Sequence, residues 1–141
     1  MFRQAMVAAS FAVLLAASAV AAERTPAPAN AEAFIIWPPD GAVIPGGKFW
    51  LRMGLRNMGI APKGVAQPKV GHHHVLIDTE LPPMNEAIPS DRNHLHFGGG
   101  DTEARIELPP GRHTLQLLLG DHDHVPHDPP VQSKKITITV P

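Results

Sequence analysis

The stretch 102–119, TEARIELPPGRHTLQLLL, contains two strand patterns joined by a turn. Aliphatic residues alternate with charged ones over 102–108, which is the period of a strand with one face in a core. Two prolines and a glycine at 109–111 turn the chain, and the apolar run 113–119 predicts a central strand. This stretch therefore favours an all-β fold.

The same pattern continues on both sides of that stretch. Short apolar runs bounded by proline and glycine predict further strands at 34–37, 48–55, 72–78 and 134–140, with a weak strand between 79 and 101. The 16 prolines and 12 glycines leave no long helical period outside the first residues. We predict an immunoglobulin/fibronectin-like antiparallel β-sandwich of about seven strands, formed by residues 34–141 as a single domain.

The first 22 residues have the pattern of an export signal. Arg3 precedes the apolar stretch 5–20, and Ala19-Val20-Ala21 forms a small-x-small cleavage site. Residues 23–33 are polar and rich in proline, and they predict a flexible lead-in. We therefore expect a periplasmic or secreted protein with no membrane span after signal cleavage. An uncleaved membrane anchor is the alternative.

Composition excludes several classes of protein. The chain has no cysteine, which rules out a disulfide scaffold, a thiolate metal centre and a blue-copper electron carrier. The net charge is −1, and the basic residues are scattered along the chain. Nucleic-acid surfaces need clustered Lys and Arg, so no nucleic-acid partner is expected.

The distribution of the histidines indicates a functional site. Eight of the nine histidines fall in the segments 72–74, 94–96 and 122–127, and each segment contains a His-x-His pair. Alternate side chains of a strand share a face about 6.5–7 Å apart, so two imidazoles can converge on one ion. In an immunoglobulin-like sandwich, the connections that hold these segments lie at one end. The sequence therefore predicts a copper or zinc site built from His72, His74, His94, His96, His122, His124 and His127.

Two histidines are set apart from that group. His73 points opposite to its neighbours in a regular strand, and His113 follows the turn at the far end of the sandwich. Aspartates near the clusters, such as Asp121 and Asp123, are candidates for orienting the rings. The alternatives to a metal site are a metal-free network of hydrogen bonds that holds the loops, a pH sensor and an accidental surface cluster.

Four segments carry a resemblance to a known family. They are GHHHVLID at 71–78, HLHFGGG at 94–100, LPPGRHTLQL at 108–117 and the residues from Leu119 to Val131 around GDH and VPHDPPV. They resemble a bacterial family of small exported domains, domain of unknown function family 4399, over about residues 71–140. The resemblance implies an exported single domain and no established activity.

Three functions follow from these observations. The first is an exported protein that stores, ferries or buffers copper or zinc, with copper favoured by the usual affinity order of divalent metals. The second is a metal-dependent enzyme, a hydrolase or an oxidoreductase, with Asp121 or Asp123 as general base. The third is an envelope-associated module that binds a protein partner. No catalytic nucleophile and no organic cofactor is predicted, so the sequence leans away from an enzyme.

Overall fold

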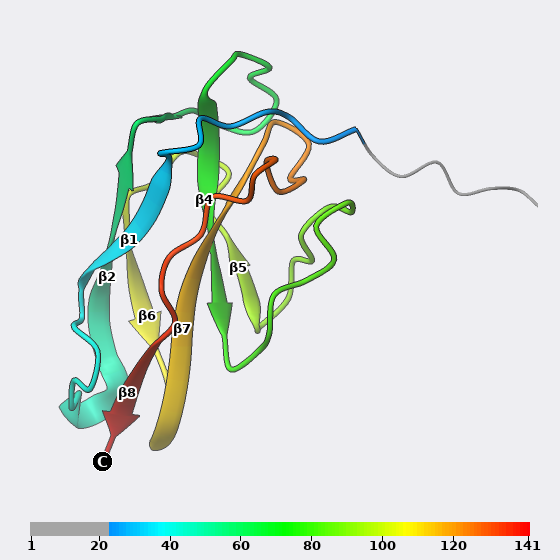
Figure 1. The fold of residues 1–141 in the computed structure, drawn as a ribbon. Helices are drawn as coiled ribbons and strands as arrows, with labels where there is room; N and C mark the ends of the chain where they lie inside the picture. Colours follow the sequence, from blue (N-terminus) through cyan, green and yellow to red (C-terminus); the bar gives the residue numbers. More distant parts are fainter. Residues whose placement is uncertain (1–22) are drawn as a thin grey trace, which may run out of the picture.

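Two β-sheets pack face to face in the computed structural model, which describes residues 23–141 (Figure 1). The first sheet has the order β1-β2-β6, and its strands are antiparallel. The second has the order β3-β4-β7-β8, with β5 paired to β4. The bounds are β1 Glu32–Trp37, β2 Lys48–Arg56, β3 Gly59–Ile60, β4 Val70–Ile77, β5 His94–His96, β6 Glu103–Glu107, β7 Gly111–Gly120 and β8 Ile136–Val140, with a short 3-10 helix at Pro45–Gly47.

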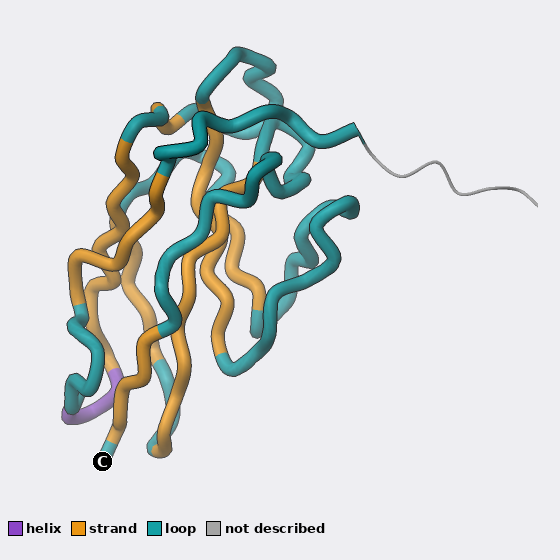
Figure 2. Tube along the Cα trace, viewed as in Figure 1, coloured by secondary structure: helices purple, strands orange, loops and turns teal. Residues whose placement is uncertain are grey.

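The predicted all-β sandwich is confirmed. Strands and loops make up nearly all of the described chain (Figure 2). The turn after β6 carries the chain from one sheet to the other, and β7 and β8 then form an antiparallel hairpin. β3 pairs with β4 in the parallel direction. The predicted signal at 1–22 lies outside the described residues.

The core lies between the two sheets. β2 contributes Leu51 and Met53, β4 contributes Val75, and β7 contributes Leu115 and Leu117, all of which are buried. Each such side chain stabilises the fold by roughly 1.5–3 kcal/mol through removal of apolar surface from water.

The outer face of the second sheet is also covered. Leu76 of β4 and Leu118 of β7 pack there against Ile88, with Met84 beside them. The segment between β4 and β5 therefore crosses this face, and every residue from 71 to 77 is buried. Buried on both faces, β4 is a rigid base for the side chains that it carries.

The segment 23–33 is bonded to the rest of the molecule. Its polar, proline-rich sequence predicts a flexible lead-in, but Ala27 N donates to Asp128 O at 2.9 Å and Asp128 N donates to Thr25 O at 2.9 Å. β1 already begins at Glu32. Backbone pairing with a distant loop gives this proline-rich segment hydrogen-bond partners that local sequence does not reveal. In the described part of the chain, no helix has the length and hydropathy needed to cross a bilayer.

Candidate metal centre

His72 and His74 lie on the outer face of β4. Successive side chains of a strand point to opposite faces, so these two rings share the face of Leu76, while His73 shares the core face of Val75. The three histidines are 0%, 0% and 1% exposed in chain order. The strand therefore presents one buried pair of imidazoles on one side and a single imidazole on the other.

β5 brings a third ring to the pair. In the antiparallel register of β4 and β5, His96 lies directly opposite His74, and partners in such a register share a face. Its side chain is half-buried. Phe97 lies between His96 and Gly98, and its N donates to His73 O at 3.1 Å. This hydrogen bond holds the end of β5 against β4.

A fourth ring comes from the loop that follows β7. His124 has a φ of +66°, a left-handed conformation that costs an L-residue roughly 1–2 kcal/mol. The loop holds it there: His124 N donates to Asp121 O at 2.9 Å, and Asp121 N donates to Val125 O at 3.0 Å. His124 O accepts from Ile88 N at 2.9 Å, which ties this loop to the segment that covers the sheet.

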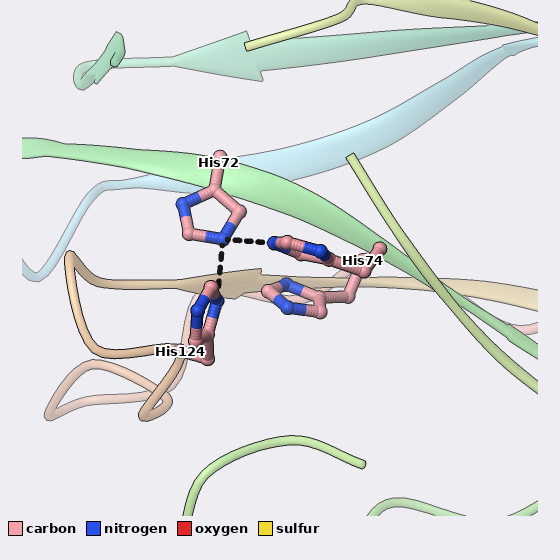
Figure 3. Close-up of side chains that lie close together, drawn as sticks. His72, His74 and His124 are labelled. Atoms are coloured by element: carbon pink, nitrogen blue, oxygen red, sulfur yellow. Dashed lines mark hydrogen bonds between the residues drawn. The ribbon is translucent and has the colours of Figure 1, made fainter. Parts of the chain in front are cut away.

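The four rings converge on one point (Figure 3). His72 Nε2 lies 3.0 Å from His124 Nδ1 and 3.2 Å from His96 Nε2. Ring centroids are separated by 4.5 Å for His96 and His124 and by 5.8 Å for His74 and His124. One ligand atom from each residue can be chosen so that all four lie within 4.8 Å of one another.

Two glycines make room for these rings. A Cβ atom added at Gly98 would lie 2.4 Å from His96 Cε1, and one added at Gly120 would lie 2.6 Å from His74 Cε1. Side-chain atoms cannot approach that closely, so any larger residue would displace the imidazole. Gly98 and Gly120 therefore shape the site although neither can bind an ion through a side chain.

Burial lowers the pKa of three of the four rings, those of His72, His74 and His96. It lowers the pKa of His74 to about 3, with smaller contributions from the charges of His72, His96 and His124. Burial also lowers the pKa of His72 to about 4, assisted by His124 and His96 and opposed by Asp121. The pKa of His96 is lowered by burial, by His124 and by Lys63. The lone pairs of these three rings are therefore available at neutral pH.

Hydrogen bonding among the rings alone does not satisfy them. A neutral imidazole nitrogen carries either one proton or one lone pair, yet His72 Nε2 faces two other ring nitrogens. Within residues 23–141, the Nδ1 atoms of His72 and His74 are buried and have no hydrogen-bond partner. A cation at the centre would use several lone pairs at once. Tetrahedral ligation with bonds of about 2.0–2.1 Å separates ligand nitrogens by about 3.3–3.4 Å, so the four residues fit a transition-metal ion.

The other three predicted ligands lie elsewhere. His94 is opposite Leu76, two residues further along the strands than the pair of His74 and His96, and its Nδ1 lies 2.8 Å from Asp91 Oδ1. His122 Nε2 lies 3.2 Å from Asp123 Oδ2 at the surface. His127 is buried over Gly71, on the other face of β4, and its Nε2 lies 3.1 Å from Val70 O.

The two histidines that the sequence sets apart also lie outside the cluster. His73 faces the sandwich core, and in the described chain neither of its ring nitrogens has a hydrogen-bond partner. His113 lies between Asp78 and Pro109, with Nδ1 at 2.7 Å from Asp78 Oδ2 and Nε2 at 2.8 Å from Pro109 O.

The sequence indicates a tight glycine turn at 98–100 beside the site, but it does not indicate the supporting roles of Gly120 and Thr25. Gly98 lies two residues after the end of β5, and Gly120 is the last residue of β7. Thr25 lies in the segment that the sequence predicts to be a flexible lead-in. Glycine beside a His-x-His pair is a signal that could have indicated crowding. No local signal marks Thr25, because its partner, Asp121, is 96 positions away.

Comparison with known proteins agrees with the sequence resemblance but gives no activity. No curated protein and no solved structure matches the chain. A family model described as "Domain of unknown function (DUF4399)" matches residues 51–141, which include all four converging histidines. With well over half of its length matched, this chain belongs to the DUF4399 family.

Proposed function

We propose that this chain is an exported protein that binds one copper or zinc ion through His72, His74, His96 and His124. The observation that carries the proposal is the convergence of four imidazoles, with ligand atoms within 4.8 Å of one another, from three separate parts of the chain. Export is supported by the basic, apolar and small-residue pattern of residues 1–22.

The ligand set selects the class of metal. Imidazole suits copper, zinc, nickel and iron, whereas magnesium, calcium and manganese prefer oxygen ligands. Cu(II) binds nitrogen sites more tightly than Zn²⁺ in the usual order, so copper is the preferred ion when both are present. Two of the rings are fully buried and two are half-buried, which leaves an approach from the side of His96 and His124.

Storage, transfer or buffering of the ion is the role that fits best. In the described part of the chain, no carboxylate belongs to the group of converging ligands, and Asp121, whose charge acts on His72, accepts hydrogen bonds from the loop. A general base positioned beside the ion is what metal hydrolases use to activate water. The arrangement of the described residues supports binding rather than turnover.

Metal stoichiometry tests the proposal. Untagged protein is stripped with a chelator, dialysed against Cu²⁺ or Zn²⁺ and analysed for metal and protein. We expect about one ion per chain, and loss of the bound ion in the variant with all four histidines changed to alanine. Binding weaker than micromolar in the wild-type chain would end the proposal.

His94→Ala and His122→Ala are the matched controls. Both remove an imidazole from the same sequence segments as the cluster, but neither side chain lies in it. They should bind the ion as the wild type does. A loss in these variants equal to that in His96→Ala would show that the imidazoles bind metal without a defined site.

A further inference from the structure

We infer that Thr25 positions His124 through Asp121, so that docking of the N-terminal segment completes the four-histidine site. The segment Arg24–Ala27 is named the strap below. The inference rests on the proposed metal-binding function, because its consequence is a change in metal affinity.

The strap is fastened along the loop that carries His124. Pro26 bridges Asp128, with backbone hydrogen bonds of 2.9 Å from Ala27 N to Asp128 O and from Asp128 N to Thr25 O. The Arg24 guanidinium donates to Pro126 O at 3.2 Å and also to His127 O. Figure 1 shows this first described segment running beside the loop between β7 and β8, far from it in sequence.

Asp121 connects the strap to the loop. Its Oδ2 accepts from Thr25 Oγ1 at 2.6 Å, while its Oδ1 accepts from Asp123 N at 2.9 Å and from Val125 N at 3.0 Å. These two amides flank His124 on either side. The carboxylate therefore sets the backbone on both sides of the ligand, and Thr25 sets the carboxylate.

The hydrogen bond from Thr25 helps to stabilise the buried carboxylate of Asp121. Asp121 is 3% exposed, and burial raises the pKa of its carboxyl. The hydrogen bonds from Thr25, Val125 and Asp123, together with the charge of His122, outweigh burial and lower that pKa overall. Without the Thr25 hydroxyl, the buried Oδ2 loses its donor, and the carboxylate is held only by the two amide hydrogen bonds to Oδ1. The loop then holds His124 less firmly in its disfavoured left-handed conformation.

Thr25→Val in the full chain tests the inference with Cu²⁺ alone as the probe. Valine keeps the shape of threonine and removes the hydroxyl. We expect Cu²⁺ affinity to fall about tenfold, at the low end of the effect of groups that orient metal ligands. The electron paramagnetic resonance spectrum of the bound Cu(II) should also change, since one nitrogen ligand is less well placed. Thr25→Ser, which retains the hydroxyl, should bind as the wild type does.

Thr79→Val is the matched control. Thr79 is also half-buried, and it follows the end of β4 that is remote from His72. It should leave affinity and spectrum unchanged. Equal losses in Thr25→Val and Thr79→Val would overturn the inference, because they would report a general loss of stability.

A double-mutant cycle with His124→Ala locates the effect. If the strap acts through this ring, Thr25→Val causes no further loss once the ring is absent. A tenfold loss in both backgrounds would contradict positioning of His124. Unchanged Cu²⁺ binding by Thr25→Val would contradict the role of the strap but not the four-histidine site. Failure of the wild type to bind Cu²⁺ would contradict the proposed function itself.

Discussion

A single added methyl group is expected to damage the candidate site at Gly98. In Gly98→Ala the new Cβ would lie 2.4–2.5 Å from the His96 ring, so the imidazole must move away from the other three. We expect metal affinity to fall about tenfold or more with little change in the free energy of unfolding, since the ring is half-buried. Isothermal titration with Zn²⁺ and urea unfolding measure the two quantities.

The neighbouring glycine provides the control for that substitution. A Cβ at Gly99 would lie 3.5 Å from Asp101 Oδ2, an ordinary contact, and Gly99 has no positive φ. Gly99→Ala should therefore bind metal as the wild type does. If both alanine variants lost affinity equally, the loop as a whole, rather than the space beside His96, would determine binding.

At the level of one strand, β4 separates a binding face from a packing face. His73 faces the sandwich core with both ring nitrogens unpaired within residues 23–141. Burial lowers the pKa of His73 to about 4. A buried polar group without a partner costs about 1–3 kcal/mol, so His73→Leu should raise the free energy of unfolding by about 1 kcal/mol while metal affinity stays constant.

Low pH should increase the difference in stability between the wild type and His73→Leu. Because the folded-state pKa of His73 lies below its unfolded value of 6.5, the unfolded chain binds the proton first, and stability is lost as pH falls from 6.5 towards 4. His73→Leu should lose less stability over this range, as measured by urea unfolding at pH 7 and pH 5. An unchanged pH dependence would mean that the His73 ring finds a partner that the described residues do not provide.

The strands could be predicted from sequence because their signals are local. Alternation in β6 and the apolar run of β7 place both strands within a few residues of their observed bounds. The site could be predicted only in part. His72 and His74 share a face by strand period alone, but the choice of His96 over His94 depends on the register of β5 against β4. The choice of His124 over His122 and His127 depends on the turn of the loop, which Asp121 sets from within.

Across the whole molecule, the two ends of β4 respond to pH in opposite directions. At the end away from the cluster, the two ring nitrogens of His113 face a carboxylate oxygen and a carbonyl oxygen, and two acceptors favour the doubly protonated, charged ring. Burial lowers the pKa of His113, but the hydrogen bonds to Asp78 and Pro109 and the charge of Asp78 outweigh it and raise the pKa overall.

That raised pKa gives a prediction with a definite sign. The stability that the Asp78–His113 pair contributes is fully present below the unfolded pKa of about 6.5 and is lost as pH rises through the folded value. Asp78→Asn retains the acceptor for Thr114 N but removes the charge. It should therefore destabilise the protein more at pH 5.5 than at pH 9 in urea unfolding. A difference that is the same at both pH values would show that His113 is neutral in the fold.

β5 is only three residues long, and its pairing with β4 leaves its other side at the border of the sheet. An unpaired edge strand of this kind can pair with a strand of another chain. An ion coordinated by His96 and by the rings of β4 would hold this short strand against β4. The metal-loaded protein would then resist self-association through that border, and its shelf life in concentrated solution would depend on the ion as much as on the apolar interior.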